Sequence, residues 1–137
     1  MKITAVHAHV LRLPEVSAIC EGTQDTCLIQ IETDAGITGW GEVDSCPSVV
    51  KAVIEAPLSH QICNGLANAL IGADPLAVEA CMAHMDAAAN YYGRVGVGAH
   101  AMAGINQALW DIAGKAHDAP IYQLFGGPFN RSFRAYC

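Results

Sequence analysis

Hydrophobic and polar residues alternate over the first third of the chain, a pattern typical of β-strands. The first alternation runs from Lys2 to Leu13 and ends at Pro14, which cannot donate to a strand ladder. Its two expected faces are Ile3, Ala5, His7, His9, Leu11 and Leu13 against Thr4, Val6, Ala8, Val10 and Arg12. A second alternation follows, with Cys27, Ile29, Ile31 and Thr33 on one face. The sequence Asp34-Ala35-Gly36 suits a turn into a third strand at 37–43, so an antiparallel meander is expected.

The hydrophobic period changes from two to 3.6 after Pro47, so the next part of the chain is expected to be helical. The expected helices span Pro47 to about Pro57, Ile62 to Leu70, Asp74 to Tyr92 and Ala99 to Ala116, with a short turn at 121–125. The helix at 99–116 has few polar positions and should therefore be covered on two sides. Residues 132–137 are expected to form one more strand, the start of a second sheet. The predicted fold class is α+β, a three-stranded meander followed by a helical bundle.

Composition and charge narrow the class of protein. The 137 residues are 53% hydrophobic and only 15% charged, which suits one domain whose apolar surface meets a partner or a missing domain. The net charge of −6 comes without a basic run, so nucleic acid is not expected as a partner. Neither a secretory signal nor an apolar run long enough to span a bilayer is visible, so we expect a soluble, cytoplasmic protein without a membrane partner.

Several residues admit both a chemical and a structural interpretation. His7 and His9 share a strand face at a spacing that can seat a metal, but no third ligand is evident, which favours a structural or surface role. The six cysteines form no C-x-x-C pair, so most are expected to be buried hydrophobes. The glycines of 93–98 lack the G-x-G-x-x-G order and follow a helix, which favours a helix-to-helix connection over a phosphate loop.

Two further groups are interpreted in the same way. Asp111 and Lys115 lie four residues apart on a helix, so we expect an ion pair rather than a catalytic pair. Trp40 stands between two glycines, which favours core packing where backbones approach closely. A functional contact by the adjacent Glu42 is the less favoured alternative.

Two stretches carry a resemblance to a known family. Residues 31–42, IETDAGITGWGE, resemble the second hairpin of the capping domain of mandelate racemase and muconate-lactonizing enzymes, in the enolase superfamily. Residues 108–116, ALWDIAGKA, and 120–127, PIYQLFGG, resemble the helix and linker that lead from that cap into the barrel. The resemblance implies an enolase-like N-terminal capping domain at 1–127. Residues 128–137 would be the linker and the start of a C-terminal barrel that is absent here.

The resemblance also implies a chemistry. Family members abstract the proton α to a carboxylate, using magnesium held by acidic residues of the barrel together with Lys or His bases. The expected function is the capping, substrate-specificity domain of such an enzyme, most simply an acid-sugar dehydratase, inactive as this fragment. Magnesium would be bound by the missing barrel, so no catalytic residue or metal ligand is assigned to this chain. The expected partners are a small carboxylate or acid-sugar substrate and further copies in a homo-oligomer.

In the family, two loops of the cap close over the mouth of the barrel. They correspond here to Glu15–Asp25 and Asp44–Val49, and the candidate substrate-lid residues are Cys20, Glu21, Thr23, Asp44 and Ser45. One departure is Asn106-Gln107, where many relatives have an acidic residue; the role of that position is left open. The alternative function is a stand-alone module that dimerises or binds a small ligand without catalysis.

Overall fold

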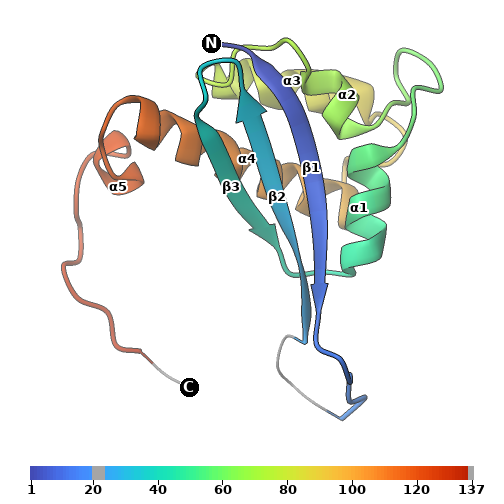
Figure 1. Cartoon of the computed structure of the whole chain (residues 1–137), viewed down its shortest axis with the longest axis horizontal. Coiled ribbons are helices and arrows are strands. Elements are labelled where there is room, and N and C mark those ends of the chain that lie inside the picture. The colour runs from blue at the N-terminus through green and yellow to red at the C-terminus, as the bar shows by residue number, and fades with distance from the viewer. Residues whose placement is uncertain (20–23, 136–137) are drawn as a thin grey trace.

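The computed structural model describes residues 1–19 and 24–135. A three-stranded antiparallel sheet is formed by β1 (Ile3–Arg12), β2 (Asp25–Thr33) and β3 (Thr38–Val43), in the order β1-β2-β3. The helices follow it in the chain: α1 (Pro47–Glu55), α2 (Leu66–Leu70), α3 (Val78–Ala88), α4 (Val97–Ala116) and α5 (Ile121–Leu124). Figure 1 shows the whole chain. The predicted α+β meander with a helical bundle is confirmed.

The turn between β2 and β3 is built as the sequence predicts. Gly36 has a φ of 75°, a value that favours glycine. The hydroxyl of Thr33 donates to the carbonyl of Ile37 at 2.8 Å and accepts from the N–H of Ile37 at 3.2 Å. Thr33 is buried, and these two bonds satisfy its polar side chain.

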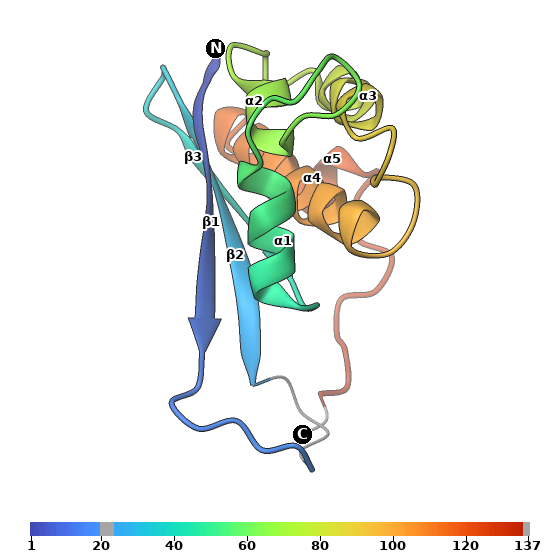
Figure 2. The ribbon, with the colours of Figure 1, turned by 90° about the vertical axis from the view of Figure 1, so that its right-hand side faces the viewer.

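The hydrophobic core lies between one face of the sheet and the helices, which all lie on that side (Figure 2). From β2 the core receives Cys27, Ile29 and Ile31, all fully buried, as the alternation predicts. From the helices it receives Val50, Ile54, Leu66, Leu70, Met85, Ile105, Leu109 and Ile112. Helix α4 packs against both the sheet and the other helices, so the expectation that it is covered on two sides is confirmed.

The predicted faces of β1 are wrong at its start. A register shift between Ile3 and Ala5 marks a β-bulge, which moves Ile3 onto the same buried face as Val6 and Ala8. A strict alternation would have placed Ile3 with His7 and His9, whose side chains are exposed.

Three other expectations are corrected. Helix α3 begins at Val78 rather than at Asp74, because the Asp74 carboxylate accepts from the N–H of Leu76 at 3.1 Å and holds a separate turn. Helix α2 begins at Leu66, and Ile62 is exposed outside it. The strand expected at 132–137 is not formed over 132–135, because no strand lies beside that segment to bond with it; residues 136 and 137 lie outside the described range.

Glycines set the spacing between α4 and β3. A Cβ on Gly39 would lie 2.2 Å from the carbonyl oxygen of Ala108, and one on Gly41 would lie 2.0 Å from that of Gly104. Only residues without a side chain fit here, so the close backbone approach expected around Trp40 is confirmed. Trp40 itself is 44% exposed, because alternation turns its side chain to the face opposite the helices; its expected place in the core is wrong.

Candidate substrate-lid site

The two candidate lid segments lie at the same end of the sheet. The first connects the end of β1 to the start of β2, and the second follows the end of β3. Because neighbouring strands are antiparallel, the end of β1, the start of β2 and the end of β3 lie together at one end of the sheet (Figure 1). The β1–β2 pairing continues to Arg12 and Asp25, beyond the point where Val43 pairs with Cys27, so the first segment projects further than the second.

The base of the first segment is closed by Gln24. Its side chain accepts from the N–H of Ser17 at 2.7 Å and donates to the carbonyl of Ser17 at 2.8 Å. The carbonyl of Gln24 also accepts from the N–H of Leu13 at 2.9 Å, which extends the strand pairing by one step. The candidates Cys20, Glu21 and Thr23 lie outside the described residues.

The second segment is attached to helix α4. The hydroxyl of Ser45 and the Nδ1 atom of His100 lie 2.8 Å apart, within hydrogen-bond distance. Cys46 follows with a φ of 28°, an unusual value for a residue with a side chain, and buried Pro47 starts α1. Asp44 is exposed, and Ser45 is half-buried. Two of the five candidate residues are thus placed together on a segment that the surrounding structure holds in position.

A threonine joins the bases of the two segments. The hydroxyl of Thr26, at the start of β2, lies 2.8 Å from Glu42 Oε1 and 3.3 Å from the carbonyl oxygen of Val43, at the end of β3. Glu42 is therefore oriented by its own sheet, and the position of the second segment is set relative to the first.

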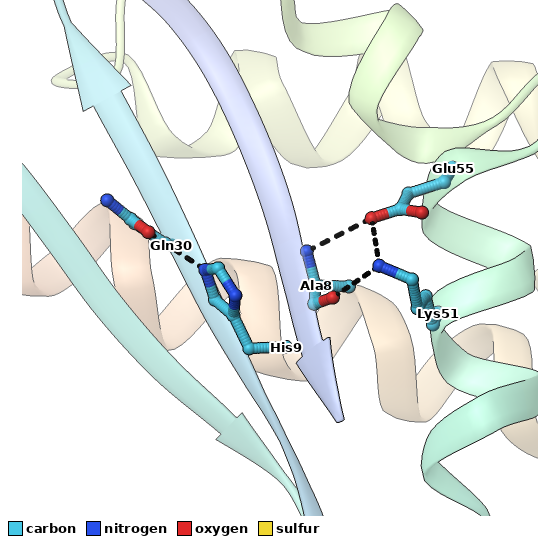
Figure 3. A network of polar contacts seen from close by, with 5 residues as sticks. All are labelled: Ala8, His9, Gln30, Lys51 and Glu55. Atoms are coloured by element: carbon cyan, nitrogen blue, oxygen red, sulfur yellow. Dashed lines mark hydrogen bonds and ion pairs between the residues drawn. The ribbon is translucent and has the colours of Figure 1, made fainter. Parts of the chain in front are cut away.

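The described residues hold no group of three or more His, Cys, Asp or Glu side chains arranged to bind a metal ion. His7 instead lies 3.8 Å from Glu32, and His9 is bonded to the side-chain oxygen of Gln30 at 2.8 Å (Figure 3). These contacts agree with the structural or surface role predicted for the two histidines. In the part of the chain that the structure describes, no helix is both long and apolar enough to cross a membrane.

The described cysteines divide into two groups. Cys27 and Cys81 are buried, and burial raises the pKa of each thiol above its ordinary value of 9.0. A protonated buried thiol is a weak nucleophile, so these two act as small hydrophobes, as predicted. Cys63 is half-buried and Cys46 is exposed, so two of the four described cysteines are buried as predicted and two are not.

Sequence reasoning missed the residues that hold the site. His100 contacts Ser45, which lies 55 positions earlier. The side chain of Gln107, whose role was left open, accepts from the N–H of Glu42 at 3.1 Å. No local pattern could reveal either contact, because each joins a strand end to a helix far away in the chain.

Comparisons with known proteins agree with this architecture. Residues 2–126 match the family model of the mandelate racemase / muconate lactonizing enzyme N-terminal domain. The chain is 37% identical over 141 residues to a D-galactarolactone cycloisomerase from Agrobacterium fabrum, covering 99% of the chain and 35% of that protein. It is 41% identical over 110 residues to a D-galactonate dehydratase from Klebsiella pneumoniae, covering 79% of the chain and 26% of that protein.

A solved structure shows the same fold. The crystal structure of the 3,6-anhydro-D-galactonate cycloisomerase from Zobellia galactanivorans superposes with a TM-score of 0.76 at 29% identity, covering 95% of this chain and 33% of that one. The chain therefore belongs to the mandelate racemase and muconate lactonizing enzyme family, as its N-terminal domain. It spans about a third or less of the length of the curated relatives it matches.

Proposed function

We propose that this chain is the substrate-specificity cap of an enzyme that abstracts the proton α to the carboxylate of an acid sugar, with dehydration as the reaction. The observation that carries the proposal is the placement of both lid segments at one end of the sheet, in a chain 37% and 41% identical to relatives named for acid-sugar chemistry. In this proposal 1–127 form the cap, and 128–137 form the linker and the start of a barrel.

The two segments would contribute differently to recognition. The first projects from the sheet and would bring Cys20, Glu21 and Thr23 to the substrate. The second is fixed by Ser45 and His100, so it would form a wall of the closed site. A hydroxyl has one donor and two acceptor positions, so Ser45 keeps hydrogen-bonding capacity for a sugar hydroxyl. The exposed carboxylate of Asp44 would accept hydrogen bonds from sugar hydroxyls.

The chemistry itself would belong to the barrel. Magnesium held there by acidic residues would stabilise the negative charge that develops on the substrate carboxylate. The cap would exclude water and orient the sugar before proton transfer. We propose that the chain alone is therefore inactive, that the whole enzyme works in the cytoplasm, and that it assembles as a homo-oligomer.

An exposed apolar surface on α4 and α5 supports the proposal of a barrel. The rings of Trp110 and Phe125 lie 4.5 Å apart, and Phe125 is 63% exposed. They line a cleft of about 540 Å³ together with Trp40, Asn106, Gln107, Asp111 and Ile121. An aromatic surface of this kind is typical of a site that another domain covers.

The gene sequence beyond codon 137 tests the proposal most simply. We expect an open frame that continues with acidic residues at the spacing of barrel strands; a stop codon at that point would favour the stand-alone module. In the enzyme encoded by such a frame, Asp44→Ala and Ser45→Ala should each lower kcat/KM for an acid sugar and leave magnesium affinity unchanged. Asp86→Ala, an exposed acid on α3, is the matched control, and equal effects of all three substitutions would contradict the lid assignment.

A further inference from the structure

The outer edge of β3 is bonded to side chains of helix α4. The N–H of Trp40 donates to Asp111 Oδ2 at 2.8 Å, and the N–H of Glu42 donates to Gln107 Oε1 at 3.1 Å. Lys115 Nζ donates to the carbonyl of Thr38 at 2.7 Å. β3 is the last strand of the sheet, so these are the backbone groups that a fourth strand would bind.

The spacing of the two elements explains how one helix reaches three positions of a strand. Residues four apart on a helix advance by about 6 Å, and residues two apart on a strand advance by about 6.6 Å. Gln107, Asp111 and Lys115 are four apart, and Glu42, Trp40 and Thr38 are two apart in the opposite direction. The two repeats therefore stay in register over all three bonds.

Two features of the sequence make the contact possible. Gly39 and Gly41 let the backbone of α4 approach β3 closely, as the clashes of an added Cβ show. The ion pair between Lys115 Nζ and Asp111 Oδ2, 2.6 Å long, orients both side chains toward the strand. The ion pair predicted from the sequence is confirmed, and both of its side chains also form hydrogen bonds with backbone groups of β3.

The opposite edge of the sheet is bonded in a similar way. Lys51 Nζ donates to the carbonyl of Ala8 at 2.7 Å, and the N–H of Ala8 lies 3.4 Å from Glu55 Oε1 (Figure 3). Lys51 and Glu55 form an ion pair of 2.7 Å on α1, again four residues apart. Both outer strands of this sheet are thus bonded along their free edges by side chains of a neighbouring helix.

We propose that Gln107, Asp111 and Lys115, here called the α4 ladder, act in place of a fourth strand and keep β3 from pairing with β3 of a second copy of this chain. Strand β3, Thr38-Gly39-Trp40-Gly41-Glu42-Val43, contains neither the lysine nor the proline that commonly protects an edge. Antiparallel pairing centred on Trp40 would set Thr38 of each copy opposite Glu42 of the other, a two-fold symmetric contact. A second copy is therefore the partner that an uncovered β3 fits.

The double variant Gln107→Ala/Asp111→Ala tests the proposal in the full chain. Hydrogen exchange at the Trp40 and Glu42 amides, followed by NMR at low concentration, should become about tenfold faster, as expected for the loss of one hydrogen bond at each amide. Raising the concentration should restore the protection, and sedimentation should then show a dimer. Asp111→Asn keeps an acceptor oxygen and should exchange like the parent, as should Asp86→Ala.

Two results would overturn the proposal. Unchanged exchange at Trp40 and Glu42 would show that the ladder does not protect the edge. Fast exchange at every concentration, without dimerisation beyond that of the parent chain, would show that a second copy is not the excluded partner. If the double variant also loses protection at Ile29 and Ile31 in the core, it has failed to fold, and Asp111→Ala alone is measured by the same two criteria.

Discussion

The hydroxyl of Ser45 lies 2.8 Å from Nδ1 of His100, which ties the segment after β3 to the start of helix α4. This contact fixes one of the two proposed lid segments to the body of its own domain. The other segment, between β1 and β2, is closed at its base by Gln24 and extends beyond the sheet. The two segments therefore leave the same end of the sheet, and the second is held there by its contact with α4.

The contact between Ser45 and His100 should be measurable as a coupling energy. We expect Ser45→Ala and His100→Ala, taken singly and together, to give a coupling of about 0.5–1 kcal/mol, the range of an ordinary neutral hydrogen bond at a partly exposed site. Urea unfolding of the parent, the two single variants and the double variant gives the free energies needed for this double-mutant cycle. Strictly additive losses of stability would show that the two side chains do not interact in solution.

The glycines of β3 should be intolerant of any side chain. In Gly41→Ala the new methyl group would lie 2.0 Å from the carbonyl oxygen of Gly104, so α4 must move away from the sheet. We expect a loss of about 3 kcal/mol in the free energy of unfolding, the upper part of the range for overpacking. Gly36→Ala is the comparison, because Gly36 has open space around it and only its φ of 75° is strained.

The loss at Gly36→Ala should be about 1 kcal/mol, the cost of a left-handed backbone for alanine. Chemical denaturation of Gly41→Ala and Gly36→Ala in parallel shows whether a steric clash or backbone strain causes the larger loss of stability. Equal losses would mean that the close approach of α4 is not what selects glycine at position 41.

The free energy of unfolding should decrease as the pH rises above 9. Burial raises the pKa of the Cys27 and Cys81 thiols above 9.0 and that of the Tyr92 hydroxyl above 10.0. As the pH rises above 9, the unfolded chain releases these protons first and binds fewer of them, so the free energy of unfolding decreases. Below pH 9 the stabilising contribution of the two thiols is fully present.

Urea unfolding between pH 7 and 10.5 measures this dependence. The variant Cys27→Ala/Cys81→Ala should be less stable at neutral pH and should lose less stability between pH 9 and 10. A parent chain whose stability is flat or rising over that interval would contradict the assignment of buried, protonated thiols.

The aromatic surface around Trp110 should make the chain self-associate when no barrel covers it. Phe125→Ser should lower the association measured by light scattering, because Phe125 is 63% exposed and contacts Trp110. Leu58→Ser is the matched control, since Leu58 is 66% exposed and does not line the cleft next to Trp110. A parent chain that stays monomeric at high concentration would count against an uncovered domain interface.

The strands and most of the helical pattern could be predicted from local signals. Alternation identified the buried face of β2, and the Asp34-Ala35-Gly36 turn identified the hairpin that follows it. The face on which Ile3 lies could not be predicted, because the β-bulge between Ile3 and Ala5 breaks the alternation of β1. No residue in the sequence marks the position of that bulge. The start of α3 was missed because Asp74 and Pro75, which resemble a helix start, form a separate turn.

The candidate site was predictable only in part. The positions of its two segments follow from the order of the strands, which the sequence indicates. The contacts that hold the second segment and the end of β3 join them to α4 across 55 and 65 positions, and such pairs leave no periodic signal. Trp40 illustrates the limit, since its neighbouring glycines correctly indicated a close approach although the tryptophan faces away from it.

We propose that this chain helps to recognise an acid sugar and leaves the chemistry to residues outside it. An α-proton exchange assay tests it most directly, with D-galactonate and magnesium in D₂O and the purified chain as the only protein. We expect no deuterium incorporation and no dehydration above the buffer control. Turnover that EDTA abolishes would contradict it, because the chain would then carry its own metal site and base.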